Sequence, residues 1–555
     1  LKKKLLIMIS LIFKLTLIST QIICYQSSIV QKNLGSQIIP KHYESPVFRF
    51  ANHYADHMVL QKSPYRAVIW GFGQENSDVI IEVKEKRYET VVQKNAYGEN
   101  VWNVTLDPQD SEQPILIQGF SIVGNHLVTI ELKDVLFGDV WICGGQSNMQ
   151  FPTNEAFTSN EELNISSKYT NVRLFTAGRY YTNVAIREIS TSNILQQWTL
   201  PSRDSVASFS AVCWMYGRKL YDIYKVPIGL ISSNQGGSCI ESWSSPQTLK
   251  VCNATSKYPV TFNNDNVLWN AMISPFLKTT IYGAIWYQGE QNAINPEGYN
   301  CTFPAMINGW RKEWSDGTGG QTNIKFPFGF VQLASFNDGT TPGFPTLRWL
   351  QTAGYGYVPN KQQENTFMAV AMDLADNNSP YGSIHPRDKA DVAERLVLAV
   401  RSVVYKENVY WTGPIFSKAA ICLPIGIKST TIQNIVVYYT VESVEAQSII
   451  IASLDGFEVL QSNGNWIQAQ VSYSINNKVL LTTNVTDVHA LRYAWKPNPC
   501  AFKSCAIYSA SNLPSPPFIS YGPFHYIFPL IGNSYTKKNI KMKLNHKDAK
   551  ICQFQ

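Results

Sequence analysis

The sequence predicts a multidomain protein of mixed α/β and all-β class, in which a central α/β domain with a parallel sheet is flanked by β-sandwich-type domains. The chain has 555 residues, which is too long for a single hydrophobic core. Short apolar stretches between turn residues indicate β-strands over about 47–132 and again after 411. Between about 138 and 405 the strands alternate with segments of helical spacing, which is typical of a parallel sheet covered by helices.

Residues 1–24 are expected to be a signal peptide. Three lysines at 2–4 precede a nearly apolar run over 5–17, and smaller polar residues follow before Cys24. This run is shorter than the ~20 residues that a membrane-spanning helix needs, and Lys14 interrupts it. We therefore expect a protein of the secretory pathway, secreted or lysosomal, with no membrane anchor.

Residues 25–135 are expected to form an N-terminal β-sandwich domain. Apolar stretches at 67–70, 79–83 and 127–132 have the length of strands and are bounded by turn residues. No segment of helical periodicity separates them, which favours a sandwich over an α/β arrangement.

Residues 136–408 are expected to form the central α/β domain. Its last helix has the clearest pattern, because the apolar residues recur at helical spacing and Pro386 suits a first turn, where a missing N–H costs nothing. The expected elements are strands at 282–287, 328–332 and 367–372 and helices at 210–224 and 390–405.

Residues 409–516 are expected to form a C-terminal β domain, with strands that include 434–439 and 478–482. Beyond it, aromatic residues give way to a lysine-rich end. We therefore expect residues 517–555 to be a linker and a basic tail.

The net charge of +7 at pH 7 comes from the two ends of the sequence. Four lysines precede position 15, and six lie between 537 and 550. Nucleic-acid binding needs a basic face that neutralises phosphates, and the domains between these ends carry no such excess of positive charge. We therefore expect no nucleic-acid partner.

Ten cysteines suit an oxidising compartment. If Cys24 leaves with the signal peptide, nine remain, so at least one is free or pairs between chains. Cys500 and Cys505 lie close enough in sequence to close a short loop, and Cys252 with Cys301 is a second candidate pair. The sequence has no Cys-x-x-Cys motif, so zinc binding has little support.

Six Asn-x-Ser/Thr sequons make N-glycosylation an expectation for a secreted chain. Their asparagines are Asn103, Asn164, Asn253, Asn300, Asn377 and Asn484.

Four segments of the central domain are rich in reactive or hydrogen-bonding groups, and each follows an expected strand. The carboxyl ends of parallel strands meet at one edge of a sheet, so we expect the four segments to come together. They are Gln146-Ser147-Asn148, residues 231–243 with Gly236 and Gly237, residues 286–292, and residues 380–389.

Ser147 and His385 are the candidate catalytic pair. Gly144 and Gly145 end an apolar run before Ser147, so no bulky neighbour shields the serine hydroxyl. Ester hydrolysis needs a base near neutral pH, and the other seven histidines lie outside the central domain. Either residue alone can be structural. A catalytic role is favoured because all four segments are expected to lie at the same edge of the sheet.

Several segments combine, in a fixed order, into a specific pattern. They are Val140–Pro152 with Gly-Gln-Ser-Asn-Met, Gly229–Ile231 with Gly236-Gly237 and Glu241–Trp243, Trp269–Pro275, Ala284–Glu290 with Trp-Tyr-Gln-Gly-Glu, and Ser383–Pro386. With this pattern the chain resembles the sialate O-acetylesterase family of the SGNH-hydrolase superfamily. The match extends from Phe48 to Phe518.

The resemblance implies an SGNH-like catalytic domain that removes O-acetyl groups from sialic acids, with no metal ion and no organic cofactor. Ser147 would form an acyl-enzyme, and His385 would act as its base. The expected partner is therefore an O-acetylated sialic acid or a sialoglycan. The family also implies an oxyanion hole, for which either glycine of the second segment and either amide of the third would fit. These supporting residues are Gly236, Gly237, Gln291, Asn292, Gln288 and Glu290.

The acid that would orient His385 is missing from its usual place. The superfamily's Asp-x-x-His pairing falls on Gly382, and the variant of related bacterial esterases falls on Ser383. Two explanations stay open: a dyad whose imidazole is oriented by a backbone carbonyl, or a carboxylate from elsewhere in the chain. The candidate carboxylates are Asp373, Asp376 and Glu290.

Substrate-binding candidates follow from the chemistry of sialic acid. Its carboxylate calls for an arginine, which Arg348 or Arg387 would supply, and its ring could stack on Trp243. Gln146 completes this set. Two other functions stay open: an acetylesterase for other acetylated polysaccharides, and an inactive glycan-binding homologue that has lost the acid.

Overall fold

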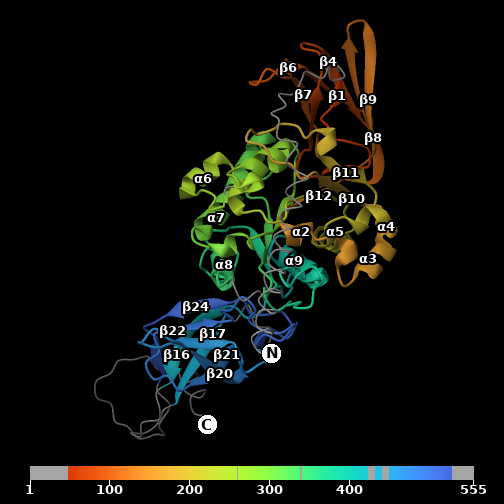
Figure 1. The fold of residues 1–555 in the computed structure, drawn as a ribbon. Coiled ribbons are helices and arrows are strands. Elements are labelled where there is room, and N and C mark those ends of the chain that lie inside the picture. The colour runs from red at the N-terminus through yellow and green to blue at the C-terminus, as the bar shows by residue number, and fades with distance from the viewer. Residues whose placement is uncertain (1–47, 259, 338–340, 423–431, 441–448, 528–555) are drawn as a thin grey trace, which may run out of the picture. The chain divides into compact units, whose positions relative to one another are not determined.

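The computed structural model describes residues 48–258, 260–337, 341–422, 432–440 and 449–527. The expected signal peptide, and the tail from 528 onward, lie outside these residues. The fold class is confirmed: a mixed sheet with parallel strands is flanked by helices and accompanied by antiparallel β parts (Figure 1).

The N-terminal β part consists of two antiparallel sheets. Along β4 (Asp78–Val83) the side chains of Val79, Ile81 and Val83 are buried, while those between them are less so, as expected for a strand with one face on a core. The first sheet has the order β1 (Arg49–Phe50), β3 (Val68–Phe72), β7 (Asn100–Thr105), β6 (Gln93–Lys94). The second pairs β5 (Lys86–Val91), β4, β8 (Ser111–Val123) and the first half of β9 (His126–Gly145).

Strand β9 belongs to two sheets. Its first half pairs antiparallel with β8, and its second half lies parallel to β12 and β13 in the central sheet. The burial pattern changes accordingly, from partial exposure near the start to unbroken burial from Val135 to Gly145. The short strand β2 (Val59–Gln61) pairs with it between the two halves. The boundary expected after residue 135 therefore falls inside one continuous strand.

The central sheet has the order β11-β10-β12-β9-β13-β14-β15, and all neighbours except β11 and β10 are parallel. From β9 the chain builds one side of the sheet and then the other, so the order reverses at β9. Ligand sites of open α/β sheets lie at such a reversal, beyond the carboxyl ends of the strands. The further strands are β10 (Val172–Ala177), β11 (Ile194–Thr199), β12 (Ile228–Asn234), β13 (Gly283–Tyr287), β14 (Phe328–Gln332) and β15 (Thr366–Val370).

Helices flank this sheet (Figure 1). The helix expected at 210–224 is present, and the Ser210 side chain caps it by accepting from the Cys213 N–H. The last helix begins at Lys389, because the Asp388 side chain caps it by accepting from the Asp391 N–H, so the placement of Pro386 in its first turn is wrong. The α-helices of the described residues are α2 (Ser147–Gln150), α3 (Ser159–Ile165), α4 (Arg203–Ala207), α5 (Ala211–Tyr224), α6 (Pro246–Cys252), α7 (Tyr299–Gly317), α8 (Phe344–Leu350) and α9 (Lys389–Val403).

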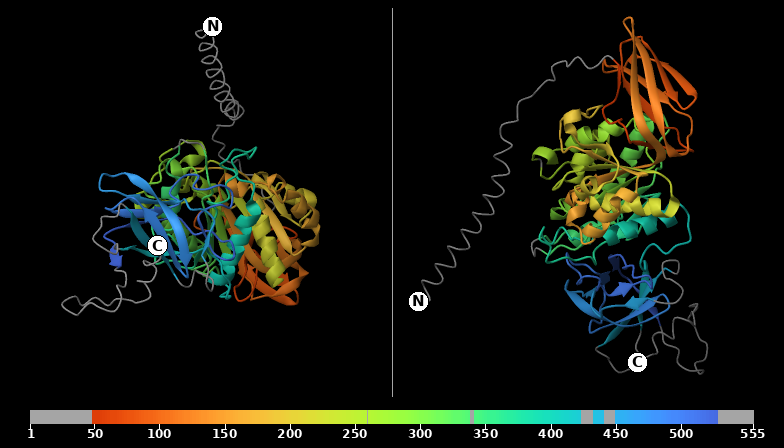
Figure 2. Two further views of the ribbon diagram at one scale, coloured as in Figure 1. Left: turned by 90° about the horizontal axis from the view of Figure 1, so that it is seen from below. Right: turned by 90° about the vertical axis from the view of Figure 1, so that its right-hand side faces the viewer.

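The C-terminal β part contains an eight-stranded sheet of order β24-β22-β19-β20-β21-β17-β16-β25, seen from two further sides in Figure 2. It continues past residue 516, because Phe518 is buried and stacks on Phe416 at 4.0 Å, so residues expected in the linker form β24 and β25. Its strands are β16 (Phe416–Cys422), β17 (Gln433–Tyr439), β19 (Phe457–Leu460), β20 (Trp466–Ile475), β21 (Lys478–Thr483), β22 (Ala490–Tyr493), β24 (Phe518–Tyr521) and β25 (His525–Ile527), beside a small pair of β18 (Ile450–Ile451) and β23 (Ile507–Tyr508).

Three disulfides join cysteines of the described residues. The two expected pairs, Cys252 with Cys301 and Cys500 with Cys505, are confirmed. The third joins Cys143 of β9 to Cys213 of α5, and its separation of 70 residues left no local signal to find it by. Within the described part of the chain, no helix combines the length and the apolar character needed to cross a membrane.

Candidate active site

Ser147 stands directly beyond the carboxyl end of β9, as the first residue of α2. Gly145 ends the strand with a φ of 141°, and a Cβ at this position would lie 2.2 Å from the carbonyl oxygen of Tyr287. Only glycine fits there. The Gln146 N–H then donates to the same carbonyl at 2.9 Å, which fixes the turn that presents Ser147 at the rim of the sheet.

His385 lies on the loop between β15 and α9. Its Nδ1 is 2.7 Å from the backbone carbonyl oxygen of Tyr381, and because a carbonyl only accepts, Nδ1 carries the proton. Nε2 of the neutral ring is therefore the basic nitrogen. Burial lowers the pKa of His385, the charge of Lys389 lowers it further, and the Tyr381 carbonyl acts in the opposite direction.

Two cavities meet at this pair. One has a volume of about 440 Å³ and is lined by Ser147 and His385 together with Gly236, Gly237 and Gln291. The other, of about 410 Å³, is lined by Ser147 and His385 together with residues of α2 and of the segment after β10. Among the described residues no hydrogen bond joins the two side chains, as is common for catalytic contacts that tighten only around a substrate.

The second segment offers one free glycine N–H. The Gly236 N–H already donates to Oε1 of Gln150 at 2.9 Å. The N–H of Gly237, which has a φ of 70°, has no acceptor among the described residues. A Cβ at Gly236 would lie 3.4 Å from the Cβ of Ser147, so small residues are needed this close to the serine. Gly237 is thus the better candidate of the two for the oxyanion.

The two candidate amides of the third segment differ in their hydrogen-bond partners, and those of Asn292 lie within the framework. Its Nδ2 donates to Glu241 at 3.0 Å, and its Oδ1 accepts from Gln288 at 2.7 Å and from the Ile240 N–H at 2.9 Å. The oxygen and one amide hydrogen of Asn292 are therefore used within the framework, and Asn292 lines neither cavity, so it is the weaker of the two candidates for the oxyanion donor. Gln291 lines the larger cavity, and its side-chain amide has no partner among the described residues.

Gln288 and Gln146 hold this segment in place. Gln288 donates to the Ser238 carbonyl at 3.0 Å and accepts from the Tyr299 hydroxyl at 3.0 Å, so its amide stabilises the framework. Oε1 of Gln146 accepts from the N–H of Gln291 at 3.3 Å, which fixes the backbone of the candidate donor. Gln146 was expected to bind substrate, and its oxygen instead positions the site, although the residue does line the larger cavity.

A buried network that sequence reasoning missed connects three of the four segments. Asn148 donates to Glu290 at 2.6 Å and to the Ile384 carbonyl at 2.8 Å, while Lys389 donates to Asn148 at 2.5 Å. Burial raises the pKa of Glu290 and lowers that of Lys389 to about 7. The network thereby ties the loop of His385 to the ends of β9 and β13.

The two aspartates expected as possible acids do not contact His385, and that expectation is wrong. Asp373 forms an ion pair with Arg395, with oxygens 2.6 and 2.9 Å from the guanidinium nitrogens. Asp376 binds Arg387 in the same two-pronged way, at 2.7 and 3.0 Å. Carboxylates held by arginines in this way are structural.

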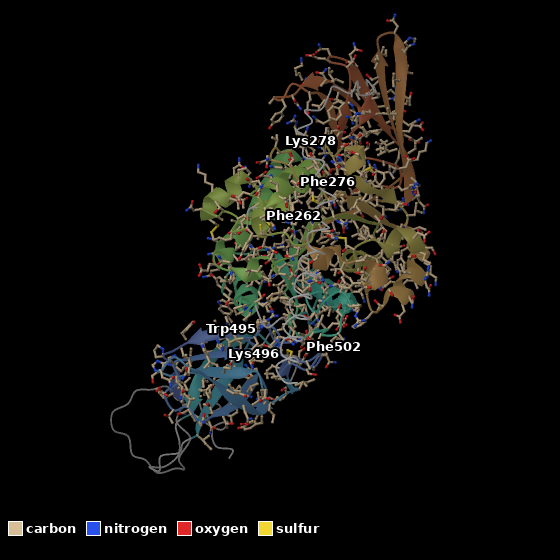
Figure 3. All side chains as sticks on the ribbon, viewed as in Figure 1. Phe262, Phe276, Lys278, Trp495, Lys496 and Phe502 are labelled. Carbon is tan, nitrogen blue, oxygen red and sulfur yellow. A yellow bond between two sulfur atoms is a disulfide. The ribbon has the colours of Figure 1, made fainter. Side chains whose placement is uncertain are left out.

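Arg348 and Trp243 are core residues, so their expected contact with substrate is also wrong. Arg348 is 0 % exposed and its guanidinium is engaged with backbone carbonyls, among them that of Lys496, which Figure 3 labels. The Trp243 indole N–H donates to Ser238 at 2.8 Å, and its ring packs against Trp286. The sequence indicated that an arginine and a tryptophan lie near the site. It could not show whether each side chain lines the cavity or is buried in the core.

A parallel sheet whose rim brings together a serine, a histidine, a free glycine N–H and a free side-chain amide offers the groups that a serine esterase needs. Comparison with protein families specifies the class further. The family model for carbohydrate esterases described as sialic acid-specific acetylesterases matches residues 137–393, and the model for the sialate O-acetylesterase C-terminal domain matches residues 426–522. The chain belongs to the sialate O-acetylesterase family, and it is a carbohydrate esterase.

Individual relatives agree. Sialate O-acetylesterase of Pongo abelii is 40% identical over 501 residues, which cover 85% of this chain and 92% of that protein. The enzyme of that name from Homo sapiens is 39% identical, with coverage of 86% and 94%. Among solved structures, a carbohydrate acetylesterase from Xanthomonas citri superposes with a TM-score of 0.71 at 26% identity, over 85% of this chain and 99% of that one.

Proposed function

We propose that this esterase hydrolyses O-acetyl esters of sialic acids through an acetyl-enzyme on Ser147, with His385 as the general base. The observation that supports this most is the imidazole geometry: the Tyr381 carbonyl holds Nδ1–H, so that Nε2 is basic in a cavity that Ser147 also lines. Membership of the sialate O-acetylesterase family supports the choice of substrate.

In the proposed reaction, the Ser147 oxygen attacks the acetyl carbonyl carbon while Nε2 of His385 takes the hydroxyl proton. The oxyanion that forms accepts from the Gly237 N–H and the Gln291 amide. The C–O bond to the sugar then breaks, and His385 returns the proton to the leaving sugar alcohol. Water, deprotonated by the same nitrogen, attacks the acetyl-enzyme, and acetate leaves as the serine regains its proton.

The pair acts as a dyad in this proposal. A backbone carbonyl fixes the tautomer and the orientation of the ring, which are two of the services that an aspartate provides in a triad. It carries no full charge, so it stabilises the imidazolium less than an aspartate would. The low pKa of His385 agrees with that difference.

We also propose that the chain is a glycoprotein of the secretory pathway, secreted or lysosomal, that begins with a signal peptide. Three disulfides are typical of proteins made in an oxidising compartment. All six sequon asparagines are exposed: Asn103, Asn164, Asn253, Asn300, Asn377 and Asn484. Digestion of the secreted protein with an endoglycosidase should lower its apparent mass, and an unchanged mass would reject the glycosylation.

The test of function is acetate release by the purified full chain from 9-O-acetylated sialic acid, from acetylated xylan and from an arylacetate. We expect Ser147→Ala to lower turnover of every ester by at least about a thousandfold. The matched control is Ser192→Ala, which removes an exposed hydroxyl of the same domain. It should behave like the wild type.

Two outcomes would contradict the proposal. Faster turnover of acetylated xylan than of the sialic acid would mean an esterase for other polysaccharides. Equal and negligible hydrolysis by the wild type and by Ser147→Ala would leave only a glycan-binding role.

A further inference from the structure

Arg179 lies at the same rim as the candidate catalytic residues. It follows β10 by two residues, and β10 is parallel to β12, whose end carries the second segment. The cavity of about 410 Å³ brings Arg179 together with Ser147 and His385. Among the described residues that line either cavity, Arg179 is the only arginine or lysine.

Its guanidinium is unlike those of the other arginines near the site. Arg348, Arg387 and Arg395 are all engaged by carbonyls or carboxylates. Arg179 is exposed at the cavity and has no hydrogen bond or ion pair with any described residue. Partial desolvation by the protein lowers the pKa of Arg179, and no neighbouring anion offsets that effect. A guanidinium in this state is ready to bind an anion that enters the cavity.

The direction in which an ester lies follows from where the donors are. The Gly237 and Gln291 candidates line the larger cavity, so the carbonyl oxygen of a bound acetyl group points there. The alcohol half of the ester leaves from the other side of the carbonyl carbon. It therefore extends into the cavity that Arg179 lines.

We infer that Arg179 binds the carboxylate of the sugar acid whose acetyl ester lies at Ser147, and that it thereby selects acidic over neutral acetylated sugars. The inference rests on the proposed function. The fork of a guanidinium matches a carboxylate with two parallel hydrogen bonds. Glu155 is the carboxylate of the same cavity; it forms no ion pair with Arg179, and burial raises its pKa. The substrate carboxylate is thus expected at the arginine end of this cavity.

The experiment compares acetate release from 9-O-acetylated sialic acid with release from its C1 methyl ester, which has nearly the same shape but no charge. For the wild type we expect a higher kcat/KM with the free acid. Arg179→Gln should lower that preference by roughly ten- to hundredfold, mainly through KM, because hydrogen bonds to an ionised partner are lost. Arg179→Lys should restore part of it.

Arg203→Gln is the matched control, since Arg203 is an exposed arginine that bonds to Asn164 on the same domain. It should keep the wild-type preference. If Arg179→Gln also keeps that preference, the inference is overturned although the esterase proposal stands. If the wild type releases no acetate from either compound, the proposed function itself has failed.

Discussion

Nδ1 of His385 donates to a backbone carbonyl, and in the proposed dyad this contact replaces the aspartate that the sequence lacks at 382 and 383. The Tyr381 carbonyl lies four residues before the histidine, so one turn of the loop supplies both groups. Two of the three carboxylates that the sequence offered in its place form ion pairs elsewhere, Asp373 with Arg395 and Asp376 with Arg387. The third, Glu290, accepts from Asn148. The sequence around a carboxylate does not show which side chain the carboxylate will pair with in the folded protein.

The pH profile of kcat/KM should reflect the environment of His385. Because the base must be neutral, activity falls as pH drops through the folded-state pKa of His385, which burial and Lys389 place below the ordinary value of about 6.5. The acid limb should thus have its midpoint below about pH 6.5. The pH profile should be recorded with an arylacetate that has no ionisable group in the pH range of the measurement. A midpoint above the ordinary histidine value would contradict this account.

Asp373→Asn separates a structural carboxylate from a catalytic one. Asp373 and Arg395 are both buried, so the variant leaves the guanidinium with only the longer ion pair to Asp391, at 3.5 Å, and should lower the free energy of unfolding by about 3 kcal/mol. The folded fraction should retain the wild-type pH profile. Denaturant unfolding and kinetics at low temperature measure the two effects.

Asp316→Asn is the control for this variant, because it breaks an exposed pair with Lys312 on α7 and should leave the melting temperature nearly unchanged. Loss of the acid limb in Asp373→Asn would instead return Asp373 to the role of orienting acid.

At the level of secondary structure, the site is assembled where the strands β9, β12 and β13 end and the helix α9 begins. β9 delivers Ser147, β13 delivers Glu290 and Gln291, and the start of α9 delivers Lys389. The side-chain amide of Asn148 connects these elements, because it donates to Glu290 and accepts from Lys389, which lies 241 residues further along the chain. The structure thus uses the residue next to the candidate nucleophile to hold the loop of His385.

Lys389→Met should misplace that loop. The methionine fills similar volume but leaves the Asn148 oxygen without a donor, so kcat should fall at least about tenfold with a smaller change in KM. Because the charge of Lys389 lowers the pKa of His385, the acid limb should also move to higher pH. Lys312→Met, at an exposed position of α7, is the control. An acid limb that stays in place would mean that Lys389 has no influence on the histidine.

The elements of the central domain were predictable in kind because their signals are local. Fully buried strands such as β14 appear as continuous apolar runs, and α9 appears as a helical stripe. Ser147 and His385 could be proposed from the sequence as a candidate pair because each lies in a distinctive motif. Arg179 has no such motif, and its relevance depends on a cavity that only the fold creates. Arg348 was expected to bind substrate and is buried instead, because the sequence carries no signal that an arginine will be buried.

Across the whole molecule, the parts of the chain share structural residues. β9 contributes to both the N-terminal and the central sheets, so neither sheet is complete without it. Arg348 of α8 donates to carbonyls at Leu333 and Ala334 and, far along the chain, to those at Lys496 and Pro497. Domain boundaries set from composition could not show such sharing.

Arg348→Met tests this sharing. The substitution leaves buried carbonyls on two segments without donors, so it should lower the free energy of unfolding by at least about 3 kcal/mol. We expect a single cooperative transition in the wild type, and a lower or split transition in the variant when followed by calorimetry. An unchanged transition would show that these carbonyls find other partners at little cost.

The acetyl-enzyme is the central claim, and trapping it is the most direct test. The full chain is mixed with 9-O-acetylated sialic acid, quenched in acid during turnover, digested and mapped by mass spectrometry. We expect an acetyl group on Ser147 that disappears when the substrate is exhausted. Release of acetate with acetylation at another residue, or at none, would contradict the claim.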